Sequence, residues 1–143
     1  MTIAAILKLK GNTVTTVRPS VSVQNAARIL AENGIGSLVV VDHGRHPVGI
    51  VSERDVVRFI AREGAACLDR EVGEIMTPEP KTCREDHTID EIMAMMTTHR
   101  FRHVPVVSDD GLIGIVSIGD VVKHKIAEAE METAAMRAYI TTG

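Results

Sequence analysis

The chain has 143 residues, of which 45% are hydrophobic and 24% charged, and its net charge is −3. This length and composition suit one globular domain with an aliphatic core, and the acidic balance argues against a nucleic-acid binder that relies on overall charge. No apolar run is long enough to cross a membrane, and the two cysteines, Cys67 and Cys83, lack a CxxC spacing, which favours free thiols in a reducing cytoplasm.

In chain order, residues 1–13 are predicted to form a short N-terminal helix and a lead-in. A short strand at 14–17 follows, and then a helix that Ser22 can cap and Gly34 can end. The next elements are a buried strand, a turn, a returning strand and a helix, at 38–41, 42–47, 48–51 and 53–63. On that last helix we expect three side chains to face inward, those of Val56, Val57 and Ile60.

The second half begins after a linker at 67–80, which Pro78 and Pro80 keep extended at its end. Thr82 is predicted to lie in a short strand, and the next helix begins at a Thr-x-x-Glu capping box. The remaining elements are two strands, at 104–107 and 112–116, and a helix from Ser117 to Ile140.

The two halves repeat one pattern. Residues 49–57 and 114–122 both begin Gly-Ile-Val-Ser and both end Asp-Val-Val, and similar strands at 37–41 and 103–107 precede them. A duplicated unit this short rarely buries its hydrophobic face alone, so the two copies should share one core.

Helices and hairpin strands alternate in each copy, which predicts the α+β class. We expect two β-α-β-β-α repeats that pack pseudo-symmetrically, with a short helix before them and a long helix after them. The expected boundaries are 14–66 for the first repeat, 81–126 for the second and 127–143 for the C-terminal helix extension.

Each copy places a Ser-x-x-Asp motif where a strand passes into a helix, with Ser52 and Asp55 in the first and Ser117 and Asp120 in the second. Amides at the start of a helix attract a phosphate, and an aspartate there can accept two hydrogen bonds from a ribose diol. The alternative is a capping box, in which the two side chains only satisfy the helix start. The sequence pattern leaves both interpretations open.

Basic side chains could assist at each motif. Arg54 lies inside the first motif, and Arg100 and Arg102 precede the second, although all three could also be surface residues. His99 and His103 have the four-residue spacing of a helical metal site. Because His103 begins a predicted strand, the two rings should not share a helix face, and we expect no metal.

The span from Val14 to Ile126 resembles a tandem pair of cystathionine-β-synthase (CBS) domains, also called a Bateman module. The resemblance lies in the segments 49–55, 103–107 and 114–120, together with Ile75-Met76-Thr77-Pro78 at the entry to the second copy. Members of that family typically bind adenosine-containing ligands, namely AMP, ADP, ATP, NAD(H) or S-adenosylmethionine.

The resemblance also implies roles for residues of both copies. The motif aspartates would hold ribose hydroxyls and the motif serines would lie near phosphate, while Thr16 and Thr82 would lie near the ribose or base. Two segments would frame the adenine, Gly36-Ser37-Leu38-Val39 and Arg102-His103-Val104-Pro105. Since the first copy offers Gly36 where the second offers Arg102, we expect different ligands or affinities at the two sites.

The last predicted helix carries a heptad-like stripe at positions 122, 126, 129, 133, 136 and 140. The stripe could pack on the body of the chain, or it could form the seam of a homodimer, which the resemblance favours.

The expected function is therefore a regulatory module without catalytic activity or a catalytic cofactor, which senses adenine nucleotides and signals to an unknown effector protein. The alternatives are a scaffold with vestigial sites, an RNA-binding module, or a nucleotide-processing enzyme.

Overall fold

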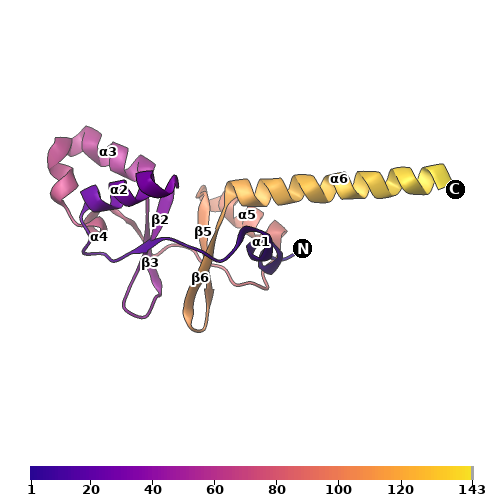
Figure 1. Ribbon diagram of the computed structural model, residues 1–143, viewed down its shortest axis with the longest axis horizontal. Helices are drawn as coiled ribbons and strands as arrows, with labels where there is room; N and C mark the ends of the chain where they lie inside the picture. Colours follow the sequence, from indigo (N-terminus) through magenta and orange to yellow (C-terminus); the bar gives the residue numbers. More distant parts are fainter. Residues whose placement is uncertain (143) are drawn as a thin grey trace.

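A computed structural model describes residues 1–142, which form two similar halves and a projecting helix (Figure 1). Helix α1 (Ile3–Lys10) comes first. The first half then contains β1 (Thr16–Val17), α2 (Val23–Asn33), β2 (Ser37–Val41), β3 (Pro47–Ser52) and α3 (Glu53–Glu63). The connection holds the 3₁₀ helix η1 (Gly64–Asp69), α4 (Val72–Ile75) and β4 (Thr77–Pro78), and the second half contains α5 (Ile89–His99), β5 (His103–Ser108), β6 (Gly111–Ser117) and α6 (Ile118–Thr142).

The sheet of the first half has the strand order β1-β2-β3-β4. Strand β1 runs parallel to β2, and the other neighbours are antiparallel. In the second half only β5 and β6 form a sheet, and a single parallel bridge from Cys83 to Val106 stands in the place of a first strand. The prediction that Thr82 lies in a strand is therefore wrong, because pairing there is confined to the one residue after it.

The helices that precede the two halves are exchanged between them. The amide of Ile3 in α1 donates to the carbonyl of His87 over 2.9 Å, which ties α1 to the second half. The amide of Val72 in α4 donates to the carbonyl of Val21 over 2.8 Å, which ties α4 to the first half. The two acceptors occupy equivalent places, one residue before the N-caps of α5 and α2.

This exchange decides how the core is divided. Each half has its own apolar cluster, which is completed by Ile3, Ile6 and Leu7 of α1 in one case and by Val72 and Ile75 of α4 in the other. A small third cluster joins the halves through β2 and β6, with Val39, Val41 and Leu112 at its centre. The expected single shared core is thus two cores linked by a bridge.

Helix α3 buries a narrower face than the sequence pattern predicts. Val56 is buried and Phe59 packs against the same cluster, but Val57 is 66% exposed and Ile60 39% exposed. Successive residues of a helix are about 100° apart, so Val57 lies well away from the face that Val56 and Phe59 share, and Ile60 lies at the edge of that face.

Helix α6 continues well beyond the body of the second half (Figure 1). Its 25 residues correspond to a length of about 38 Å. The stripe lies uncovered along it, since Val122, Ile126, Met136 and Ile140 are all exposed. Packing of the stripe on the chain's own body is therefore excluded. Within residues 1–142, no helix combines the length and apolar character that a membrane span requires.

The α+β class, the two repeats, the short first helix and the long last helix agree with the expectations from the sequence.

Candidate functional site

The two Ser-x-x-Asp motifs form matching turns at the β3–α3 and β6–α6 junctions. The amide of Ser52 donates to Asp55 Oδ2 over 2.9 Å, and the amide of Asp55 donates to Ser52 Oγ over 3.2 Å. Ser117 and Asp120 repeat the pair of hydrogen bonds at 2.9 and 3.1 Å. Both motifs are thus true capping boxes.

Capping uses only part of the Asp55 carboxylate. Its Oδ2 accepts from Ser52, while Oδ1 lies 3.8 Å from an Nη atom of Arg58, a loose ion pair whose arginine is largely exposed. A carboxylate oxygen can accept more than one hydrogen bond. The capping role therefore leaves Asp55 free to accept hydrogen bonds from a ligand, and the two interpretations of the motif are compatible.

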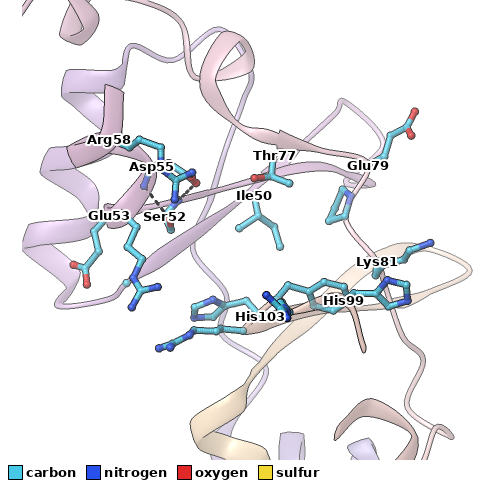
Figure 2. Close-up of a pocket in the computed structure, with 16 residues that line it drawn as sticks. Ile50, Ser52, Glu53, Asp55, Arg58, Thr77, Glu79, Lys81, His99 and His103 are labelled. Atoms are coloured by element: carbon cyan, nitrogen blue, oxygen red, sulfur yellow. Dashed lines mark hydrogen bonds and ion pairs between the residues drawn. The ribbon is translucent and has the colours of Figure 1, made fainter. Parts of the chain in front are cut away.

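A cavity of about 660 Å³ opens beside the first motif, between the two halves of the chain. Figure 2 shows Ser52 and Asp55 on one side of it, with His99, His103 and Lys81 on the facing side. Seven of the expected site residues line this cavity, namely Gly36, Ser52, Arg54, Asp55, Arg100, Arg102 and His103. The volume is in the range of pockets that hold small molecules and cofactors.

The other expected residues lie outside this lining. Thr16 faces a separate shallow hollow beside β1, and Ser37 lies in β2, paired with Ser52. The side chains of Leu38, Val39 and Val104 are fully buried in the core. Thr82, Pro105, Ser117 and Asp120 are also absent from the lining.

The cavity includes residues that sequence reasoning missed as ligand contacts. Thr77 enters from β4, and the Ile-Met-Thr-Pro segment that contains it was a usable signal. His99 and Phe101 stack with their ring centroids 5.6 Å apart and form part of the wall. The remaining missed residues are Ile50, Glu53 and Arg58, which flank the first motif in the sequence, and Glu79, Pro80 and Lys81, which the fold brings to it from the connection.

The charge of the lining is opposite to that of the chain. Three acidic residues, Glu53, Asp55 and Glu79, face five basic residues, Arg54, Arg58, Lys81, Arg100 and Arg102, which leaves a surplus of two positive charges in a chain of net charge −3. Within residues 1–142, Arg58 is the one member of this basic group that forms an ion pair with the protein. The cavity therefore presents four basic side chains that form no ion pair within residues 1–142, together with the carboxylates of Glu53 and Glu79.

His103 lies between the cavity and the second motif. Burial lowers the pKa of its imidazole, and the nearby ammonium of Lys10 lowers it further, so the ring is held in its neutral form. A neutral imidazole can donate one hydrogen bond and accept another. Among residues 1–142 no cluster of three or more potential ligands could hold a metal ion.

The second motif has different surroundings. Lys10 Nζ lies 2.6 Å from Asp120 Oδ2 and donates a second hydrogen bond to the carbonyl of Ile115 over 2.9 Å. Burial acts to raise the pKa of Asp120, but the hydrogen bonds from Lys10 and from the Ser117 amide outweigh it, and the pKa lies below its usual value. Asp120 is thus an ionised carboxylate that already has a cationic partner.

Comparison with known proteins places the chain in one family. The family described as "CBS domain" matches residues 11–62 and 72–127. CBS domain-containing protein CBSX3, mitochondrial, of Arabidopsis thaliana is 39% identical over 126 residues, which cover 85% of this chain and 61% of the relative. The chain spans 57% to 66% of the length of this and two other curated relatives.

Solved structures agree on the fold. The CBS-domain containing protein ATU1752 from Agrobacterium tumefaciens has a TM-score of 0.82 and 43% identity, with 87% of this chain and 99% of that chain covered.

Two less similar structures contain ligands. The CBS domain protein PAE2072 from Pyrobaculum aerophilum is complexed with AMP, with a TM-score of 0.74, 27% identity and coverage of 84% and 89%. The CBS domain pair of protein MJ0100 is in complex with 5′-methylthioadenosine and S-adenosyl-L-methionine, with a TM-score of 0.79, 27% identity and coverage of 90% and 98%. Proteins similar to this chain thus bind adenosine-containing molecules.

Proposed function

The chain belongs to the CBS-domain family, and from that membership we propose that it is a regulatory module that senses an anionic adenine nucleotide, one of AMP, ADP, ATP or NAD(H), in the cavity beside Asp55. The observation that carries this proposal is the lining itself. Asp55, whose Oδ1 has only a loose arginine beside it, is suited to a ribose diol and shares one cavity with four basic side chains that form no ion pair within residues 1–142 and are suited to phosphate.

The charge of the cavity supports a phosphate-bearing ligand over S-adenosylmethionine. The sulfonium of the latter is cationic, and it would enter a lining with a surplus of positive charge. Each phosphate of a nucleotide would instead gain from Arg54, Lys81, Arg100 or Arg102, and arginine in particular pairs with phosphate through two parallel hydrogen bonds.

Each part of the ligand has a place in this proposal. Asp55 accepts from the ribose hydroxyls. The first phosphate lies beside Ser52 at the start of α3, near the amide of Arg54, because the amides of Glu53 and Asp55 already donate to Gly36 and to Ser52 Oγ. The adenine inserts towards Ile50 and the backbone of Gly36, with Thr77 at its edge. Leu38 and Val39 contribute backbone groups only, because their side chains are buried in the core.

The module acts through binding rather than catalysis. A ligand that contacts both halves of the chain favours one arrangement of the halves over others, by its difference in affinity for them. The effector protein binds one of these arrangements in preference to the others.

We also place the chain in a reducing compartment such as the cytoplasm, because Cys67 and Cys83 are buried free thiols.

We also propose that the chain forms a homodimer through α6. The stripe at 122, 126, 129, 133, 136 and 140 has the spacing of a two-helix seam, and its large apolar members are exposed along a helix that projects from the body. A second copy of the same helix covers such a stripe most simply, by two-fold symmetry.

Isothermal titration calorimetry with AMP, ATP, NADH and S-adenosylmethionine tests the proposed ligand class. We expect measurable binding of at least one nucleotide, and binding of S-adenosylmethionine at least tenfold weaker. If S-adenosylmethionine binds more tightly than every nucleotide, or if nothing binds at millimolar concentration, the proposed function is wrong.

A further inference from the structure

We propose that Lys10 is a built-in cation that closes the second Ser-x-x-Asp motif, so that each chain takes one nucleotide, at the first cavity. This inference rests on the proposed function and adds to it the stoichiometry and the residue that sets it. It starts from the contact of Lys10 Nζ with Asp120 Oδ2 at 2.6 Å and with the Ile115 carbonyl at 2.9 Å.

The helices that lead into the two halves occupy equivalent positions. The amides of Ala4 and Gly73 donate to the carbonyls of Glu85 and Pro19, each three residues before an N-cap. A Cβ on Gly114 would lie 2.8 Å from Leu7 Cδ2, and a Cβ on the equivalent Gly49 would clash with the side chain of Met76.

Because Leu7 corresponds to Met76, the residues after them can be paired as well. Three residues further along each segment, Lys10 and Glu79 occupy corresponding positions in the two halves. Any difference between the two motifs in this region therefore comes from these few residues.

The two segments take different paths beyond this point. After Met76 the chain continues as Thr77–Pro78, where the proline cannot extend a helix and disfavours the helical conformation for the residue before it. The segment instead forms β4 and pairs with β3, which leaves the first cavity open beside Thr77.

After Leu7 no proline intervenes, and α1 continues for almost one further turn to Lys10 before Gly11 ends it with a φ of 93°. That extra turn carries the ammonium of Lys10 to Asp120, and a cation at the C-terminus of a helix is favoured by the helix dipole. The second motif is thus closed by the segment Leu-Lys-Leu-Lys-Gly at 7–11. The first motif stays open because the equivalent segment at 76–80 reads Met-Thr-Pro-Glu-Pro.

The ammonium occupies the place that a ribose would need. Lys10 donates to the same Asp120 carboxylate that the ribose diol would use, and the two side chains of this pair are only 25% to 32% exposed. In the first motif the cation paired with Asp55 is Arg58, at 3.8 Å and 58% exposed. A neutral ribose hydroxyl can displace that loose partner far more readily than it can displace Lys10.

Titration calorimetry of the full chain with AMP and with ATP tests the inference, using the variant Lys10→Ala. Lys8→Ala is the matched control, because Lys8 is an exposed lysine of the same helix and, within residues 1–142, it forms no ion pair with Asp120. We expect one equivalent of nucleotide per chain for the wild type and for Lys8→Ala, and two equivalents for Lys10→Ala. When Asp55→Asn is added to Lys10→Ala, one equivalent of nucleotide should remain bound per chain, at the second motif. Adding Asp120→Asn to that double variant should abolish this remaining binding.

Two equivalents in the wild type, or one in Lys10→Ala, would overturn the inference. If no nucleotide binds to any variant, the proposed function is wrong instead. The role of Lys10 can then still be tested without ligand, by measuring the pKa of Asp120. Carbon-detected NMR should show the pKa of Asp120 rising in Lys10→Ala and unchanged in Lys8→Ala. An unchanged pKa in Lys10→Ala would mean that Lys10 does not hold Asp120 in solution.

Discussion

Asp55 and Asp120 are the same residue in the same motif, yet their neighbours give them different capacities. Both cap a helix through Oδ2. Asp120 is also held by Lys10, while Asp55 faces an open cavity with only a loose arginine beside it. The local pattern therefore determines the turn. Whether its aspartate can also accept hydrogen bonds from a ligand is determined, in the second motif, by a lysine more than a hundred positions away in the sequence.

Asp55→Asn should weaken nucleotide binding about 10-fold to 150-fold, because hydrogen bonds to a charged group contribute roughly 1.5–3 kcal/mol. The asparagine oxygen can still accept from the Ser52 amide, so the free energy of unfolding should fall by no more than about 1 kcal/mol. Calorimetry and urea unfolding measure the two effects. Asp69→Asn, at an exposed position outside the cavity, should change neither. Equal affinity in Asp55→Asn would limit Asp55 to capping.

The Lys10–Asp120 pair should also make stability depend on pH. Because the pKa of Asp120 in the folded chain lies below its usual 3.8, the pair stabilises the fold above that pH and ceases to do so as the pH falls through the lowered pKa. Lys10→Ala should cost less than about 1 kcal/mol at pH 5–7, since the pair is partly exposed.

Urea unfolding of the wild type and of Lys10→Ala, from pH 7 down to the lowest pH at which both are folded, measures this dependence. The difference between them should shrink towards zero on the acid side. A difference that stays constant with pH would show that Lys10 stabilises by packing and not by its charge.

At the scale of elements, the positions of helices and strands follow largely from local sequence patterns. The capping boxes, the buried strands and the helix ends follow from local residue types, and most predicted boundaries lie within two residues of the observed ones. What local pattern does not show is that α1 and α4 exchange places between the halves, because that choice depends on which cluster offers the better packing.

Helix α6 gives the prediction that belongs to this scale. Met136→Lys places a charge on the exposed stripe and should weaken the proposed dimer at least tenfold, because an unpaired charge enclosed in a seam must lose its water. Met131→Lys is the matched control, since Met131 is 70% exposed and Met136 67% exposed, on opposite faces of the helix.

Analytical ultracentrifugation over a range of concentrations measures both variants against the wild type. A monomeric wild type, or equal effects of the two substitutions, would show that the stripe is not a dimer seam.

At the scale of the whole molecule, charge is distributed unevenly. The chain is acidic overall, but the cavity beside Asp55 collects basic side chains from both halves, among them Arg54 of α3 and Arg102 before β5. Such a concave basic surface attracts anions even when the net charge is negative.

Affinity for ATP should therefore fall as ionic strength rises from about 50 to 500 mM, and it should fall more steeply than affinity for AMP, because ATP carries more charge. Calorimetry at several salt concentrations, at constant pH, measures the two slopes. Equal slopes would mean that the basic side chains do not contact the additional phosphates.

The duplication, the α+β class and the two Ser-x-x-Asp turns could all be predicted from the order of residues, because they depend on periodicity and on contacts within a few positions. The folded chain was needed to learn that Val57 is exposed, that Lys81 and Thr77 join Asp55 around one cavity, and that Lys10 reaches Asp120. These outcomes join residues from distant parts of the chain, and the free energy that brings them together comes from the burial of whole apolar faces, which no short pattern specifies.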